Sequence, residues 1–453
     1  MQRSEHLSRS AVLEARSDQR SIRPSLPALL DAVSRLKDAA CRLRQRPVDD
    51  IIASLDRTIQ RLLDPNDRLR RRAEVELPTA TGFSAPMIRH GLPLLLAPLG
   101  GRQLASTLDA ELGTRRVLDD AVGGGPRACG PRACGPDLIV HVLSGNIPAL
   151  VAAPLLLSLA VKSPVVVKPA AGDPIFPGLL HEALAAVDPA LADCVLVAPW
   201  RGGDKEIEEA IFGAAALVVA SGSDPAIEAI RRRVAGRFIG HGHKISFAAI
   251  GRECLSDNAA ANDLARRLAY DVSLWDQQGC LSPQLCYVEN GGNVTADKFA
   301  ELVAEALAVL AQELPPRRLS FEESAAVQRF RQAAEWNPAN ALLASAGTEW
   351  SVSIERGCEL KPSALNRCLR LMVVDDLAEL SDELPRHRHY LEAAGLAVGV
   401  ERRREATSVF AASGVHHICP LGTMQTPTLA WRQSGSPRVG DWVEWTVIES
   451  TPA

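Results

Sequence analysis

The chain has 453 residues, of which 47% are hydrophobic and 23% are charged, and its formal net charge is −4. This length exceeds one ordinary core, so two or three domains are expected, and the balance excludes a disordered chain. The mild negative charge and the aromatic fraction of 4% argue against a nucleic-acid-binding protein.

The cysteines and the N-terminus indicate the cellular environment. Ten cysteines are spread along the chain without a CxxC pair or a zinc-ligand spacing, so no metal site is predicted. Residues 1–20 are polar and carry both signs of charge, unlike a secretory signal. The longest apolar run, 149–161, is shorter than the roughly 20 residues that cross a bilayer. We therefore expect a reduced, cytoplasmic protein without a membrane span.

Helical periodicity marks residues 1–75. Apolar residues recur at helical spacing between residues 51 and 63, which predicts an outer amphipathic helix packed on the main body. Farther on, residues 118–136 contain the unit GPRAC twice in tandem. The density of glycine and proline there predicts a surface loop.

Strand and helix patterns alternate from residue 137 to about 250. Apolar, β-branched stretches predict strands that end near residues 143, 168, 198 and 221, each followed by a helical pattern. Such alternation predicts a parallel sheet with helices on both faces. The turns after these strands would lie at the carboxyl edge of the sheet, where ligands of such sheets bind.

The second half of the chain has a different pattern. A long helix is expected over 256–279, a strand over 284–289, and helices over 295–313 and 320–336. Residues 340–420 mix short strands and helices. The tail, 428–449, reads as a loop, a short helix and a last strand.

Two polar residues stand at the ends of predicted strands. Asn146, in Ser-Gly-Asn-Ile-Pro, could aim its carboxamide at an oxyanion, although an asparagine helix cap is a common alternative. Lys168 ends a buried strand, where its charge would be costly unless it met an anion such as a dinucleotide. A lysine that simply reaches solvent is the alternative.

Other turns at the same edge suggest a nucleotide site. Gly222 and Ser223 end a strand and begin a helix, where backbone N–H groups favour a phosphate. Trp200 and Gly202 could form a wall against an adenine or a pyrophosphate. No GxGxxG fingerprint follows a strand here, so an ordinary Rossmann site is not predicted.

Cys280 lies between a long helical pattern and a strand. Gly279 allows close approach of the backbone, and Ser282-Pro283 turns the chain away. A thiolate at this position could attack an acyl carbonyl if its pKa were lowered. Taken alone, the pattern is more typical of a structural cysteine, and Cys286 in the next strand is assigned to that class.

Taken in order, these motifs resemble the aldehyde dehydrogenase superfamily. The carriers of the resemblance are Gly145-Asn146-Ile147-Pro148, Lys168-Pro169, the Gly222-Ser223 turn and Gln278-Gly279-Cys280 with Ser282-Pro283. More closely, the chain is similar to the acyl-CoA reductase branch, which includes the LuxC-type fatty-acid reductases of bacterial luminescence. The resemblance covers about residues 85 to 450.

The resemblance implies a fold and a set of roles. It implies an α/β fold with a parallel-sheet nucleotide-binding domain at 76–255, completed by about 426–453, and an α/β catalytic domain at 256–425. Residues 1–75 would be a helical N-terminal segment, and Cys280 would lie in the cleft between domains. Cys280 would be the acyl-accepting nucleophile, and Asn146 with the backbone N–H of Cys280 the oxyanion hole. Lys168, Gly222 and Ser223, with Trp200 and Gly202, would hold the nucleotide.

Two departures from the superfamily pattern refine the expectation. Hydrolytic members carry a glutamate before a Gly-Gly-Lys, whereas the matching stretch Phe238–Lys244 has no carboxylate. His241 and His243 in this stretch could transfer protons or be merely polar. Many NAD-preferring relatives carry a glutamate three residues after the lysine, where this chain has Ala171. Loss of that charge favours NADPH, with NADH as the alternative.

The expected function is NADPH-dependent reduction of an acyl-CoA to the aldehyde through an acyl-enzyme on Cys280. Two alternatives stay open: an aldehyde dehydrogenase that makes free acid, and a non-catalytic acyl-transfer subunit of a reductase complex. The expected partners are an acyl-CoA or acyl-protein thioester, an acyl-protein synthetase subunit, and further copies of the chain in a homo-oligomer.

Overall fold

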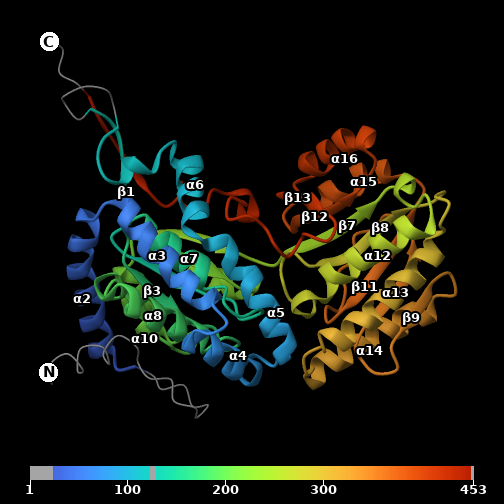
Figure 1. Cartoon of the computed structure of the whole chain (residues 1–453), viewed down its shortest axis with the longest axis horizontal. Helices are drawn as coiled ribbons and strands as arrows, with labels where there is room; N and C mark the ends of the chain where they lie inside the picture. Colours follow the sequence, from blue (N-terminus) through green and yellow to red (C-terminus); the bar gives the residue numbers. More distant parts are fainter. Residues whose placement is uncertain (1–23, 123–128, 450–453) are drawn as a thin grey trace. The chain divides into compact units, whose positions relative to one another are not determined.

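The computed structural model describes residues 24–122 and 129–449. The chain divides into two compact units, which Figure 1 colours along the sequence. Unit 1 comprises the described parts of 1–81, 92–242 and 428–453, and unit 2 comprises 82–91 and 243–427.

Unit 1 is built on a parallel sheet of five strands in the order β4-β3-β2-β5-β6. The expected strands all occur in it, because each is a short run of β-branched or aliphatic residues that both faces of the sheet bury. The strands are β2 (Ile139–Val142), β3 (Val165–Lys168), β4 (Val195–Val197), β5 (Leu217–Ser221) and β6 (Arg237–His241).

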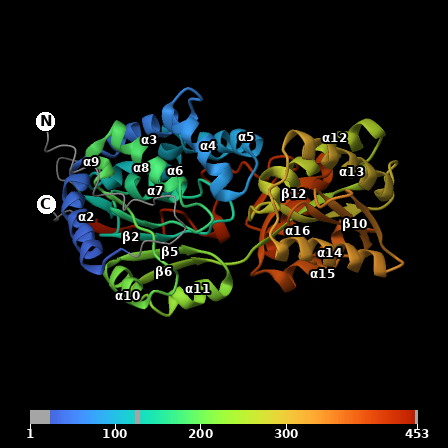
Figure 2. The ribbon, with the colours of Figure 1, turned by 90° about the horizontal axis from the view of Figure 1, so that it is seen from below.

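Helices cover both faces of this sheet, as expected. Figure 2 shows α10 and α11 on one side, and α7 and α8 on the other. Side chains of α2 and α10 share one core with the strands, while α3 packs on α7 and α8. The helices are α2 (Leu26–Gln45), α3 (Val48–Leu63), α4 (Arg68–Thr81), α6 (Gly101–Leu112), α7 (Ala152–Ala160), α8 (Phe176–Val187), α9 (Pro189–Ala192), α10 (Lys205–Ala214) and α11 (Asp224–Arg231).

The prediction of a surface loop over residues 118–136 is partly wrong. Residues 123–128 lie outside the described residues, but Gly130–Cys134 forms a strand, β1, that pairs antiparallel with β14 (Glu444–Ile448). Pro131 is tolerated because this ribbon has two strands only, so each strand keeps an unpaired edge. The last strand expected in the tail is confirmed as β14.

Unit 2 contains a sheet of seven strands in the order β13-β12-β7-β8-β11-β10-β9, parallel except for β9. The strands are β7 (Ile245–Ile250), β8 (Pro283–Glu289), β9 (Ala341–Ala344), β10 (Ser351–Arg356), β11 (Cys368–Val374), β12 (Leu391–Ala397) and β13 (His417–Pro420).

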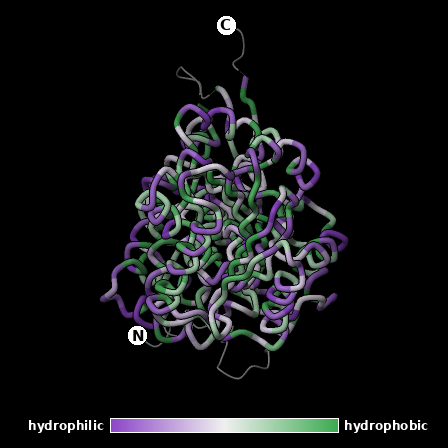
Figure 3. The backbone as a smooth tube through the Cα atoms, turned by 90° about the vertical axis from the view of Figure 1, so that its right-hand side faces the viewer, coloured by the Kyte–Doolittle hydropathy of each residue, from purple (hydrophilic) through white to green (hydrophobic). Residues whose placement is uncertain are grey.

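Two hydrophobic cores flank the sheet of unit 2. Helices α12 (Asn258–Ser273) and α13 (Ala296–Glu313) bury apolar residues against one face. Helices α15 (Leu380–Glu383) and α16 (Val400–Ser413) pack on the other face, and α14 (Phe321–Trp336) packs beside β9 and β10. Figure 3 shows hydrophobic backbone inside and hydrophilic backbone around it, as burial of apolar surface requires.

The units divide the chain at other residues than the expected domains do. The boundary was expected at residue 255, whereas the two units divide between Gly242 and His243. The division falls earlier because β7 pairs with β8 and β12 and therefore belongs to unit 2. The second division falls inside α5 (Ala85–Leu96), since Phe83 packs edge-on against Trp275 with 5.4 Å between ring centroids. The N-terminal helices α2, α3 and α4 belong to unit 1.

No helix within 24–122 and 129–449 has the length and apolar character needed to cross a membrane. The same residues contain no group of three or more His, Cys, Asp or Glu side chains that could hold a metal ion.

Candidate active site

Most of the predicted site residues gather at one edge of the sheet in unit 1. Since its strands are parallel, their carboxyl ends share that edge. The seven residues follow or end β2, β3, β4, β5 and β6 in turn: Asn146, Lys168, Trp200, Gly202, Gly222, Ser223 and His241. Cys280 and His243 belong to unit 2.

Asn146 lies in the turn between β2 and α7, and it is half-buried. It does not cap α7, whose N-cap is Val151, so the cap alternative does not hold. A Cβ on Gly145 would lie 2.8 Å from the Cβ of Ala170 and 2.9 Å from the Cα of Gly172. This contact requires glycine, and it presses the turn that carries Asn146 against the turn after β3.

Asp173 stabilises the same turn through hydrogen bonds to backbone N–H groups. Its carboxylate accepts hydrogen bonds from the backbone N–H groups of Ala149, at 2.9 Å, and Phe176, at 3.1 Å. Burial raises the pKa of Asp173 to about 6, against the opposing effect of these donors. Ala149 has a φ of 64°, and the hydrogen bond that its N–H donates to Asp173 stabilises this disfavoured conformation.

Lys168 and Trp200 lie side by side at the ends of β3 and β4. The Lys168 ammonium is 5.7 Å from the centroid of the Trp200 ring. Burial lowers the pKa of Lys168, and Glu208 acts in the opposite direction. The indole N–H of Trp200 is buried and has no hydrogen-bond partner within the described residues, so it is available to a ligand. Gly202 lies in the exposed turn that follows.

Gly222 and His241 contact each other at the ends of β5 and β6. The backbone N–H of Gly222 donates to the carbonyl of His241 at 3.1 Å, so this amide is already used within the protein. Ser223 is exposed and is the N-cap of α11. His241 Nδ1 lies 3.5 Å from the Ser434 hydroxyl.

Cys280 lies three residues before β8, at the amino edge of the sheet in unit 2. It is exposed, whereas Cys286 in β8 is fully buried, and burial strongly raises the pKa of the Cys286 thiol. The two cysteines are therefore chemically distinct, since only an accessible thiolate can attack a substrate. His243 is exposed and precedes β7 at the same edge.

Neighbouring elements hold the backbone around Cys280. The Ser246 hydroxyl, on β7, donates to the carbonyl of Cys280 at 2.7 Å. The Gln425 carboxamide donates to the Ser282 hydroxyl at 2.7 Å, and a Cβ on Gly279 would lie 2.7 Å from Gln425 Oε1. The glycine before Cys280 thus makes room for Gln425.

Asp271, on α12, fixes the segment that carries Gln425. Its carboxylate accepts from the backbone N–H groups of Gly422, at 2.6 Å, and Met424, at 3.1 Å. Burial raises the pKa of Asp271 to about 7, against these donors. Neither Asp271 nor Gln425 nor Ser246 was predicted from the sequence, because no local motif indicates contacts between residues that are 34 to 151 positions apart.

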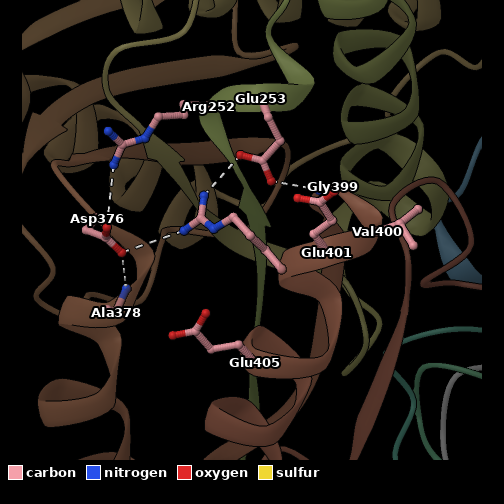
Figure 4. A pocket seen from close by; sticks show the side chains of 9 residues that line it. Arg252, Glu253, Asp376, Ala378, Gly399, Val400, Glu401 and Glu405 are labelled. Atoms are coloured by element: carbon pink, nitrogen blue, oxygen red, sulfur yellow. Dashed lines mark hydrogen bonds and ion pairs between the residues drawn. The ribbon is translucent and has the colours of Figure 1, made fainter.

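A hollow of about 670 Å³ lies at the carboxyl edge of the sheet in unit 2, opposite to the edge that carries Cys280 (Figure 4). Its walls include Arg252, Glu253, Asp376 and Arg402, and no predicted site residue. Arg402 pairs with the buried carboxylate of Glu289 at 2.6 and 2.8 Å. Burial alone would raise the pKa of Glu289, but hydrogen bonds from Arg402 and Arg252 outweigh it and hold that pKa well below its usual range. Arg252 and Arg402 form ion pairs with the carboxylates of Glu253, Glu289 and Asp376 at this edge.

The fold is that of an aldehyde dehydrogenase. The structure is similar to a putative aldehyde dehydrogenase from Anabaena variabilis, with a TM-score of 0.70, 16% identity and coverage of 95% of both chains. It is also similar to a glyceraldehyde-3-phosphate dehydrogenase from Methanocaldococcus jannaschii, solved in complex with NADP, with a TM-score of 0.69, 13% identity and coverage of 94% of both chains. At these identities the likeness establishes the fold alone.

The chain belongs to the acyl-CoA reductase (LuxC) family, whose model matches residues 43–437. It is 24% identical over 365 residues to the long-chain acyl-protein thioester reductase of Vibrio harveyi. That alignment covers 78% of this chain and 72% of the relative. The expected family and fold class are thus confirmed.

Proposed function

We propose that this chain reduces a fatty acyl thioester to the aldehyde through an acyl-enzyme on Cys280. The observation that carries the proposal is the exposed Cys280 on a turn held by Ser246 and Gln425, in a member of an acyl-CoA reductase family. A cysteine nucleophile divides one difficult reduction into two easier steps.

In the first step, the Cys280 sulfur bonds to the acyl carbon and the carbon–sulfur bond of the donor breaks. The donor leaves as a free thiol and takes up the proton that Cys280 lost. The Asn146 carboxamide and the Cys280 backbone N–H donate hydrogen bonds to the carbonyl oxygen while it carries negative charge. A carboxamide suits this role because it donates without being able to take up the acyl group.

The residues at the carboxyl edge of unit 1 fit a nicotinamide nucleotide. The Trp200 indole N–H is a buried donor without a partner within the described residues, and the Lys168 ammonium stands beside it. Ala171 is exposed and places no carboxylate near Lys168, which favours a nucleotide with a 2′-phosphate, NADPH over NADH. When bound, the nucleotide would supply the hydride that releases the aldehyde and leaves Cys280 as the thiolate.

The absence of a water-activating carboxylate from Phe238–Lys244 supports reduction over hydrolysis. An acyl-enzyme without an activated water persists until hydride or a thiol reaches it. In the reverse direction, the acyl-enzyme would need CoA or another thiol to release its acyl group, whereas an enzyme that oxidises aldehyde to free acid would not need CoA. Aldehyde oxidation by the purified chain should therefore depend on added CoA or another thiol.

The acyl donor is a fatty acyl thioester, carried either by CoA or by a protein. The family description refers to acyl-CoA, whereas the Vibrio harveyi relative is an acyl-protein thioester reductase. A panel of acyl-CoA and acyl-protein donors, each with NADPH and NADH, would rank them by the decrease in nicotinamide absorbance.

The thioester step is tested by incubating the protein with labelled acyl-CoA in the absence of nucleotide. We expect the wild type to retain the label and Cys280→Ser to lose thioester labelling by at least about 10³-fold. Cys41→Ser removes another exposed cysteine and is the matched control, which should label like the wild type. Equal thioester labelling of the wild type and Cys280→Ser would exclude Cys280 as the acyl acceptor.

A further inference from the structure

The backbone just before Cys280 has an unusual conformation. Trp275, Asp276 and Gln277 have φ angles of 57°, 50° and 64°, so three consecutive residues other than glycine are left-handed. This conformation brings Cβ close to the carbonyl oxygen, and residues other than glycine normally adopt it singly. All three side chains are buried, with at most 1% of each exposed.

A second left-handed turn lies beside the first. Leu365, Asn366 and Arg367, just before β11, have φ angles of 55°, 55° and 59°. The Arg367 side chain donates through Nε to the Asp276 carboxylate at 2.8 Å, and both side chains are almost fully buried. Gln278 Nε2 donates to Asn366 Oδ1 at 3.0 Å. Side chains of each turn thus hold the other.

Gln277 connects both turns to the segment that follows Cys280. Its Nε2 donates to the carbonyl of Pro283 at 2.7 Å and to that of Cys368 at 3.0 Å. Its Oε1 accepts from the backbone N–H of Cys368 at 3.0 Å. Cys280 lies midway between Gln277 and Pro283, so one carboxamide closes the loop that carries the thiol.

Packing makes the first turn a rigid base for this loop. Phe83 packs on the Trp275 ring, the backbone N–H of Trp275 lies 3.3 Å from the Met87 sulfur, and a side chain at Gly91 would collide with the ring. A disfavoured backbone persists only where its surroundings over-determine it, and such sites are typical of functional loops. Structural stability alone would be served better by relaxed turns.

We propose that Gln277 is a positioning residue for the acyl transfer at Cys280. Its carboxamide holds the loop 277–283 against the two left-handed turns, so that the thiol meets the acyl carbon in one preset orientation. This inference rests on the proposed function, because it concerns the geometry of that same cysteine. A displacement of about 1 Å at a reacting atom can cost on the order of 10²-fold in rate.

Two substitutions at this residue separate positioning from stability. Gln277→Ala removes the three hydrogen bonds and keeps the strained φ. Gln277→Gly removes the same bonds and relieves the strain, because glycine adopts positive φ readily. Gln328→Ala, at an exposed glutamine of α14, is the control.

For each variant we would measure the melting temperature and two rates at Cys280. The rates are those of thioester formation with an acyl-CoA and of alkylation by iodoacetamide. Alkylation by a small reagent requires an accessible thiol but little orientation. We expect both Gln277 variants to form the thioester about 10²-fold more slowly, with alkylation changed less than about threefold. Gln277→Gly should melt a few degrees higher than Gln277→Ala and yet remain as slow.

If Gln277→Gly recovered both the melting temperature and the acylation rate of the wild type, Gln277 would be structural and the proposal would be wrong. An equal loss of alkylation and acylation would also contradict it, since the thiol would then have lost access rather than orientation. Failure of the wild type itself to form a thioester at Cys280 would instead overturn the proposed function, which keeps the two failures distinguishable.

Discussion

The predicted site residues lie at opposite edges of the two sheets. In unit 1 the carboxyl edge holds Asn146, Lys168 and Trp200 on short turns, as is usual for open α/β sheets. In unit 2 the predicted nucleophile, Cys280, lies at the amino edge, and the carboxyl edge carries ion pairs around Glu289. The same strand arrangement therefore does not decide where a site forms.

The difference lies in which polar groups remain available. The buried Glu289 carboxylate accepts hydrogen bonds from the side chain of Arg402 and the backbone N–H groups of Arg252 and Leu377. Those donors and acceptors satisfy each other. In unit 1 the buried Trp200 N–H has no such partner within the described residues. An edge with satisfied polar groups stabilises the fold, and an edge with an unsatisfied donor can bind a ligand.

The largest effect is expected from substitution of Asn146, at the carboxyl edge of unit 1. Asn146→Ala should slow acyl transfer and reduction by about 10²–10³-fold, because it removes the proposed donor to the oxyanion. Asn146→Asp keeps the shape but not the donor, and it should be at least as slow. The measurements are single-turnover rates together with the melting temperature, which should not change. A loss of less than about threefold in both variants would remove Asn146 from the reaction.

Substitutions at the carboxyl edge of unit 2 should lower the stability of the protein and leave its activity unchanged. Arg402→Ala leaves the buried carboxylate of Glu289 with fewer partners, and we expect the free energy of unfolding to fall by about 3 kcal/mol. Thioester formation by the folded variant should be unchanged. Denaturant unfolding measures the effect, with Arg403→Ala on the exposed side of α16 as the control. If acyl transfer fell while stability did not, this edge would belong to the active site.

A buried histidine in the sheet of unit 1 makes stability depend on pH. His141 lies in β2, its Nε2 is 2.8 Å from the Ser158 hydroxyl, and burial, with a smaller effect of His241, lowers its pKa to about 3. Below pH 6.5 the unfolded chain binds a proton that folded His141 does not, so stability falls as the pH is lowered.

His141→Gln should lack this dependence. Between pH 6.5 and pH 5 the wild type should lose about 2 kcal/mol more than the variant, as followed by denaturant unfolding at each pH. Parallel curves for the two proteins would mean that His141 is not held neutral.

The smallest effect concerns the nucleotide. Lys168→Met should weaken NADPH binding by about tenfold, since the proposed nucleotide site would lose one charged hydrogen bond. The matched control is Lys205→Met, at an exposed lysine that begins α10. Fluorescence titration with NADPH and NADH measures both. Equal affinities in the wild type and Lys168→Met would leave Lys168 outside the nucleotide site.

Much of the architecture could be predicted from local patterns. Runs such as 164–168 and 216–221 are continuous, apolar and rich in β-branched residues, and their alternation with helical patterns was sufficient to predict parallel strands. The order of Asn146, Lys168 and Cys280 indicated the family, which the family match confirms. The roles of these residues remain predictions, because strand ends and turns reveal position but not chemistry.

By itself, the sequence determined the elements, the family and the candidate nucleophile, since these depend on periodicity and on residues close together in the chain. Only the tertiary structure decided that Gly130–Cys134 pairs with the last strand, and that Gln425 and Asp271 support the loop of Cys280. It also decided that Gln277 closes this loop through backbone groups of Pro283 and Cys368. Apart from the bond between Gln277 and Pro283, these contacts join residues that are far apart in the chain, and no local pattern of residues encodes them.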